Sequence, residues 1–110
     1  MNKLNIDLKE LNTAEQVLRK FGKVFEFGGS ENSEAWGKNW DALFDSFTAI
    51  ETGGISGTSK KFSLPLDVII LNYSTFKESC PEDFKILNDV LRETTNEYEI
   101  EGKQLHFRFE

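Results

Sequence analysis

Near both ends of the chain, apolar residues alternate with polar ones, the pattern of a β-strand with one buried face. The pattern covers residues 3–8 and residues 104–109. Residues 66–71 follow Pro65 and include four consecutive β-favouring apolar residues. This run predicts a third strand that is buried on both faces, as in a parallel sheet. The alternating apolar positions are Leu4, Ile6, Leu8, Leu105, Phe107 and Phe109.

Between the first two strands, the spacing of apolar residues changes to the 3.6-residue period of a helix. Thr13 and Gln16 form a capping-box signature, which predicts a helix over residues 14–21. Gly22 is placed to end this helix. Residues 24–27 are expected to be extended, either as a strand or as a buried loop.

The stretch from Asn39 to Phe47 predicts a second helix with two distinct faces. Asn39 is placed as its N-cap. Asp41 and Asp45 lie one turn apart on one face. Apolar residues at i, i+3, i+4 and i+7 form the core-facing stripe, which consists of Trp40, Leu43, Phe44 and Phe47.

The two aspartates contribute little to this helix. Like charges at i and i+4 disfavour a helix by about 0.2–0.5 kcal/mol. Asp41 gains from the helix dipole because it lies in the first turn, whereas Asp45 lies one turn further in. We therefore expect that a cationic group sits near the pair or that a cationic partner binds it.

Two further helices precede the last strand. A short one starts at Ser74 or Thr75 and is interrupted by Pro81, which suits the first turn of the next helix. That helix is expected over residues 82–96. The order β-α-α-β-α-α-β predicts an α/β fold, a small three-stranded parallel sheet with helices packed on it.

The length of 110 residues fits a single domain spanning residues 1–110. Within this domain, residues 52–63 are rich in glycine and small polar residues, which predicts a flexible loop. A phosphate-binding P-loop would need a Gly-Lys pair opening a helix, and this loop has no such pair.

Charge is distributed unevenly along the chain. The net charge is −6, with −4 in residues 31–51 and −5 in residues 82–101. Such a field repels nucleic acid and membrane surfaces and attracts a basic partner. No apolar run approaches a membrane span, and the N-terminus lacks a signal-peptide core, so we expect a cytoplasmic protein. The single Cys80 excludes an internal disulfide and a cysteine metal cluster.

An enzyme is one interpretation of the acidic residues. Asp41, Asp45 and Glu93 could bind a divalent cation or perform acid–base chemistry. However, the only histidine, His106, lies on an aromatic-rich strand, where a structural role is expected. Cys80 has no base partner in the sequence pattern, so the signal for catalysis is weak.

A binding module is the other interpretation. Carboxylates at helical spacing resemble a row of phosphates, which is what the basic cleft of a nuclease holds. The flanking aromatics Trp36 and Phe44 could anchor such an interface. Phe44 could equally belong to the core.

Residues 36–45, Trp-Gly-Lys-Asn-Trp-Asp-Ala-Leu-Phe-Asp, resemble the signature of the barstar family. These proteins are intracellular inhibitors of guanyl-specific ribonucleases of the barnase type. The family pattern is aromatic-Gly-x-Asn-hydrophobic-Asp-Ala-Leu-aromatic-Asp, and this chain fills every position. The resemblance implies a small parallel three-stranded α/β domain, which the periodicities predict independently.

The resemblance also implies roles for individual residues. Asp41 and Asp45 would make the principal contacts, with Asp45 in the phosphate-binding site of a basic secreted ribonuclease bound one-to-one. Glu93 would add an ion pair from the last helix. No catalytic residue, cofactor or metal is expected. The candidate partner-binding residues are Trp36, Gly37, Asn39, Asp41, Phe44, Asp45 and Glu93.

Three departures leave the identity of the target open. Ala35 stands where the type member has a tyrosine that contacts the ribonuclease, and Ser46 replaces a cysteine. The loop at residues 52–63 is longer. An alternative is therefore an antitoxin or immunity domain of the same fold that binds a different basic nuclease toxin or another protein.

Overall fold

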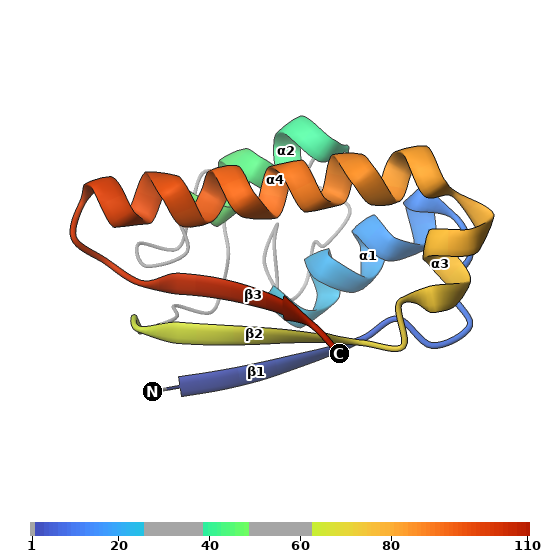
Figure 1. Cartoon of the computed structure of the whole chain (residues 1–110), viewed down its shortest axis with the longest axis horizontal. Helices are drawn as coiled ribbons and strands as arrows, with labels where there is room; N and C mark the ends of the chain where they lie inside the picture. The colour runs from blue at the N-terminus through green and yellow to red at the C-terminus, as the bar shows by residue number, and fades with distance from the viewer. Residues whose placement is uncertain (1, 26–38, 49–62) are drawn as a thin grey trace.

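The structure is a computed structural model that describes residues 2–25, 39–48 and 63–110. Within these ranges the order of elements is the predicted β-α-α-β-α-α-β (Figure 1). The elements are β1 (Asn2–Asp7), α1 (Ala14–Phe25), α2 (Trp40–Phe47), β2 (Leu66–Leu71), α3 (Ser74–Ser79), α4 (Pro81–Ile100) and β3 (Leu105–Phe109). The loop predicted over residues 52–63 lies outside the described residues except for Ser63.

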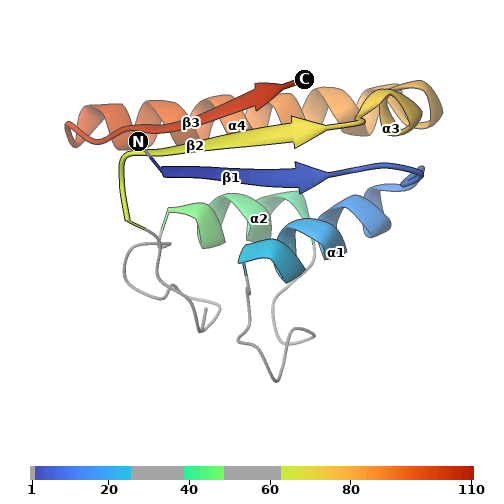
Figure 2. The ribbon, with the colours of Figure 1, turned by 90° about the horizontal axis from the view of Figure 1, so that it is seen from below.

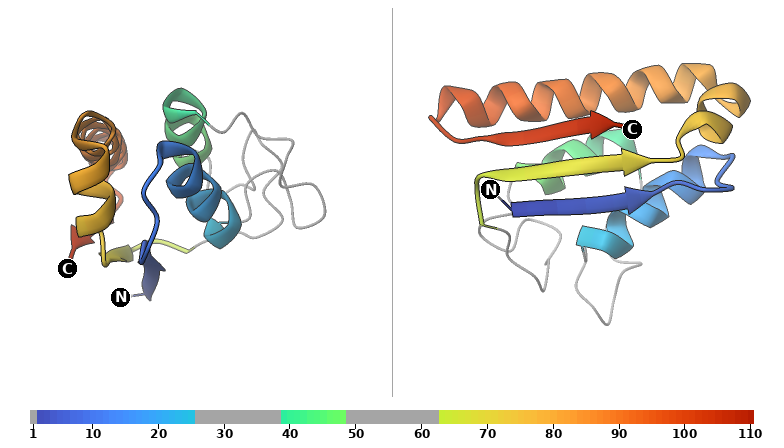
Figure 3. Two further views of the ribbon diagram at one scale, coloured as in Figure 1. Left: turned by 90° about the vertical axis from the view of Figure 1, so that its right-hand side faces the viewer. Right: turned by 60° about the horizontal axis from the view of Figure 1, so that its bottom comes forward.

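The three strands form a parallel sheet in the order β1-β2-β3. Figure 1 views the sheet nearly edge-on, with α1, α2 and α4 on the same side of it. In Figure 2, which is seen from below, α4 lies behind β3, and α1 and α2 lie along the β1 edge. In Figure 3, α3 and α4 lie on one side and α1 and α2 on the other, above the same sheet face. The predicted α/β fold is confirmed.

The prediction that β2 is buried on both faces was only partly right. Val68 and Ile70 are fully buried, whereas Ile69 and Leu71 are half-buried. The strands follow one another across the sheet in the same order as in the chain, β1-β2-β3. Two crossover connections of the same handedness then place their helices on the same face of the sheet. On the other face, the buried Asp67 is paired with Arg108 at 3.1 Å.

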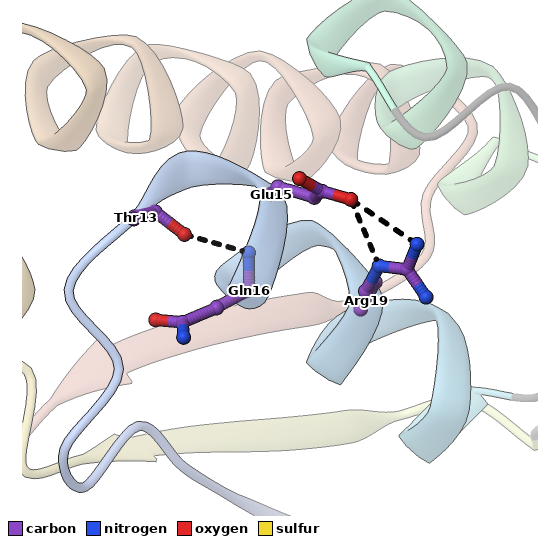
Figure 4. Close-up of polar contacts among 4 residues, drawn as sticks. All are labelled: Thr13, Glu15, Gln16 and Arg19. Atoms are coloured by element: carbon purple, nitrogen blue, oxygen red, sulfur yellow. Dashed lines mark hydrogen bonds and ion pairs between the residues drawn. The ribbon is translucent and has the colours of Figure 1, made fainter.

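The N-terminus of α1 is capped by side chains, although not by a complete capping box. The Thr13 hydroxyl accepts a hydrogen bond from the Gln16 amide at 3.2 Å (Figure 4). The Gln16 side chain, however, accepts from the Asn12 amide at 2.8 Å and not from that of Thr13. Figure 4 also shows Arg19 donating two hydrogen bonds to Glu15 on the exposed side of the helix.

The predicted end of α1 at Gly22 was wrong, because the helix continues to Phe25. The extended conformation expected over residues 24–27 was therefore wrong for residues 24 and 25, which are helical, while residues 26 and 27 lie outside the described ranges. Phe25 is fully buried, and burying such a side chain stabilises by about 1.5–3 kcal/mol. A glycine inside a helix costs only about 1 kcal/mol. Tertiary burial thus outweighs the local stop signal.

Helix α4 also exceeds its prediction and ends at Ile100, four residues beyond position 96. The added turn buries Tyr98, which is 3% exposed. The helix ends in a Schellman motif, in which Lys103 N donates to the Tyr98 carbonyl and Gly102 N to that of Glu99. Gly102 has φ +76°, a conformation that favours glycine.

A carboxylate joins the ends of β1 and β2. Asp7 Oδ1 accepts hydrogen bonds from Asn72 Nδ2 and from the Lys9 amide, both at 2.9 Å. These bonds, with the Asn72 bond the larger cause, hold the pKa of Asp7 below its ordinary value of 3.8. The charged carboxylate therefore stabilises the folded chain.

We predict that Asp7→Asn lowers the free energy of unfolding at pH 7, because the amide is a weaker acceptor than the carboxylate. A lowered folded pKa gives stability that is complete above the unfolded value and is lost as pH falls through the folded value. The difference between the two proteins should therefore shrink below about pH 3.8. Urea denaturation across this range measures it.

As a second arm, Asn72→Gly removes the main donor and preserves the positive φ of 55° at that position. An NMR titration should then show the pKa of Asp7 moving toward its ordinary value. A difference between wild type and Asp7→Asn that persists unchanged at pH 3 would contradict this explanation.

Candidate functional site

The short helix α2 is held by its apolar face. It packs against α1 and α4, with Leu43 and Phe47 fully buried. The Phe47 ring contacts those of Phe25 and Phe107, with centroids 5.1 and 5.2 Å apart. Trp40 and Phe44 are half-buried and pack against the core. The predicted stripe is confirmed, and Phe44 both packs inward and keeps part of its surface exposed.

The N-terminus of α2 is fixed by Asn39, as predicted. Its backbone is extended, and its side-chain oxygen accepts a hydrogen bond from the Ala42 amide at 2.8 Å. This bond satisfies one of the first-turn amides that have no partner within the helix. The cap therefore fixes where α2 begins, immediately before the first of the two aspartates.

Asp41 and Asp45 lie on the exposed side of α2. In the part of the chain that the structure describes, neither carboxylate has an ion pair or hydrogen-bond partner. The Asp45 backbone carbonyl accepts from the Thr48 hydroxyl at 2.7 Å, which helps to end the helix. The like-charged pair is thus left unneutralised by any described residue.

Glu93 is exposed on α4, the helix against which α2 packs. Of its acidic neighbours one turn away, Asp89 is paired with Arg92, whereas Glu97 has no partner among the described residues. Thr48, at the end of α2, lines a small surface hollow with Glu97, Tyr98 and Glu101 of α4. Glu97 and Glu101 of α4 therefore lie beside the C-terminal end of α2.

Two residues that pattern analysis did not single out contact α2. Trp40 Nε1 donates to Asp83 Oδ1 at 3.3 Å, and the Tyr98 hydroxyl donates to the Phe47 carbonyl at 2.6 Å. Tyr98 continues the spacing of the apolar residues of α4, and this signal could have identified it as inward-facing. Asp83 carried no local signal, since it counted only as one of several acidic residues.

Some predicted residues cannot be placed in the site. Trp36 and Gly37 lie outside the described residues, as does Ala35. Cys80 Sγ donates to the Asn12 carbonyl at 3.3 Å, and His106 is half-buried on β3. Within the described ranges, no group of three or more His, Cys, Asp or Glu side chains could hold a metal ion. None of the helices described there is long and apolar enough to cross a membrane.

These features define a small α/β domain whose short helix buries one face and exposes two unneutralised carboxylates on another. The family model of Barstar, described as barnase inhibitor, matches residues 1–110. The chain belongs to the Barstar family, and the resemblance seen in residues 36–45 is confirmed. This membership implies a barnase-type ribonuclease inhibitor or a related immunity domain. No curated protein matches the chain.

The cap of α2 can be tested in the free protein. We predict that Asn39→Ala destabilises it by about 1 kcal/mol, because the Ala42 amide loses its acceptor. Asn39→Asp is the control, since aspartate caps about as well as asparagine. Urea denaturation measures both, and equal stability of Asn39→Ala and wild type would show that the bond contributes nothing.

Proposed function

We propose that this protein inhibits a guanyl-specific ribonuclease of the barnase type by inserting the acidic face of α2 into the basic active site of the enzyme. The observation that carries the proposal is the pair Asp41 and Asp45, exposed one turn apart without a neutralising group among the described residues. Membership of the Barstar family gives the class of target.

The mechanism is steric and electrostatic. A ribonuclease active site holds a row of phosphates with basic side chains, and carboxylates in the same place occupy it without offering a bond to cleave. Asp45 takes the phosphate-binding site, Asp41 binds beside it, and Glu93 adds an ion pair from α4. The exposed part of Phe44 supplies apolar contact, and Trp36 and Gly37 of the family motif also contact the ribonuclease.

The inhibitor acts in the cytoplasm, forms a one-to-one complex and needs no metal or cofactor. It is not an enzyme in this proposal: it blocks a reaction and catalyses none. The excess of acidic residues on the chain also speeds encounter with a basic protein by electrostatic steering.

A second candidate is an immunity or antitoxin domain that uses the same surface against a different basic nuclease toxin. The observation that favours it is the departure at Ala35, where the family's type member carries a tyrosine that contacts its ribonuclease. A missing aromatic anchor changes which partner fits the surface, because such anchors dominate binding energy.

Titration distinguishes inhibition from catalysis. We expect the RNA-cleaving activity of a barnase-type ribonuclease to fall in proportion to the amount of this protein added. The loss of activity should reach a plateau near one equivalent. If activity is unaffected while a different basic nuclease is inhibited, the second candidate replaces the first. Metal-dependent turnover of any substrate by the protein, abolished by Asp41→Asn, would instead establish an enzyme.

Asp45→Ala should separate binding from stability. The free variant should be as stable as wild type or more stable by a few tenths of a kcal/mol, because a like-charge repulsion is removed. In the complex, unpaired buried cations cost about 2–5 kcal/mol, a range that draws in part on complexes of this family. Affinity should fall at least tenfold, and association should become slower and less salt-dependent.

Glu78→Ala is the matched control, because it removes the same charge from α3, a different helix. Denaturation curves and binding kinetics at two salt concentrations measure all three proteins. Unfolding of Asp45→Ala would make the residue structural, and unchanged affinity would remove Asp45 from the interface.

A further inference from the structure

We infer that Tyr98 and Asp83 of α4 are positioning residues, which hold the two ends of α2 at fixed points so that Asp41 and Asp45 are presented in a fixed relation to Glu93. The consequence for binding rests on the proposed function. The effect on α2 itself does not, because it concerns the free protein. The contacts that carry the inference are the two hydrogen bonds between α2 and α4.

Tyr98 holds the C-terminal end of α2. The Phe47 carbonyl is one of the last four of the helix, which have no amide partner within it. The Tyr98 hydroxyl donates to this carbonyl at 2.6 Å, and both residues are buried. Because the Phe47 ring is packed between aromatic rings of α1 and β3, the hydrogen bond links α4 to a residue whose position is already fixed by packing.

Asp83 holds the N-terminal end. Trp40 is the first residue of α2, and its indole N–H donates to Asp83 Oδ1 at 3.3 Å in a partly buried contact. Asp83 lies in the first turn of α4, where the helix dipole favours a carboxylate. This contact is longer than the usual 2.9–3.0 Å for such bonds and is the weaker of the two.

The two contacts lie far apart on α4. At 1.5 Å per residue, Asp83 and Tyr98 are separated by about 22 Å along the axis, and Glu93 lies between them. The ends of α2 are only about 10 Å apart, so the long Trp40 and Tyr98 side chains span the difference. Figure 1 shows α2 lying beside α4 with its two ends toward the corresponding ends of α4.

Two separated contacts are needed because α2 is short. An isolated helix of eight residues is not stable in water, so its direction is set by tertiary contacts. A single contact would allow α2 to pivot and move its carboxylates relative to Glu93. Fixing both ends prepares the surface before the partner arrives, which reduces the ordering cost of binding.

The first test is Tyr98→Phe, which keeps the buried ring and removes the hydroxyl. Hydrogen exchange in the free protein should become faster at the amides of α2 than in wild type, with the sheet unchanged. Tyr73→Phe is the matched control, because Tyr73 also packs among aromatic rings and its hydroxyl has no hydrogen bond in the described residues. Unchanged exchange in α2 of Tyr98→Phe would overturn the inference.

Affinity for a barnase-type ribonuclease gives the second readout. Tyr98→Phe should weaken it by about three- to tenfold, the range that the net value of one hydrogen bond allows. In the Asp45→Ala background the same change should have a smaller effect, because one of the two carboxylates that it positions is absent. Full additivity of the two substitutions would show that Tyr98 does not act through Asp45 and would overturn the inference.

Asp83 provides an independent arm should Tyr98→Phe fail to fold. Asp83→Asn and Asp83→Ala remove the same charge, but only the asparagine keeps an acceptor for the Trp40 indole. The asparagine variant should keep slow exchange in α2, and the alanine variant should lose it. Equal behaviour of the two would count against Asp83. If wild type does not bind the ribonuclease, the proposed function fails, while the exchange experiments still decide the positioning role.

Discussion

The structure of the site depends first on the burial of Phe47 at the C-terminal end of α2. Its ring packs against Phe21 and Phe25 of α1 and Phe107 of β3, and its carbonyl accepts the hydroxyl of Tyr98 from α4. Three elements thus meet at the last residue of an eight-residue helix. Since such a short helix has little stability of its own, these contacts, together with the bond from Trp40 to Asp83 at its other end, determine where its exposed face points.

The same junction explains how the fold tolerates Asp41 and Asp45. Burying Leu43 and Phe47 stabilises by about 1.5–3 kcal/mol each, whereas the repulsion between the aspartates costs about 0.2–0.5 kcal/mol. The core therefore maintains a helix whose exposed face is locally unfavourable. A surface held in this way is ready for a cationic partner, because neither carboxylate must first give up a described intramolecular ion pair.

The arrangement of the sheet places α4 on the same face as α2, where the two helices are in contact. Because α1, α2 and α4 cover the same face, α2 lies in contact with both of the longer helices. A sheet with helices divided between its faces would separate the aspartates of α2 from Glu93. On the opposite face, the buried Asp67 is paired with the half-exposed Arg108 of the neighbouring strand.

The sequence by itself determined the features that depend on neighbouring residues. These include the order of helices and strands, the cap at Asn39 and the two faces of α2, because local periodicity and capping act within one or two turns. The motif in residues 36–45 was enough to indicate the Barstar family, and Asp41, Asp45 and Glu93 were identified as exposed acidic candidates from the same local patterns.

Only the tertiary structure decided the features that depend on contacts between distant segments. Helix α1 continues through Gly22 because Phe25 is buried against Phe47, and α4 is extended by the turn that contains Tyr98. The coverage of one face of the sheet or of both likewise depends on residues more than forty positions apart. So does the identity of the acid that accepts the hydrogen bond from the Trp40 indole N–H. At these positions the helix propensities of residues differ by only about 1 kcal/mol, whereas burial of a large apolar side chain contributes more to the stability of the folded chain.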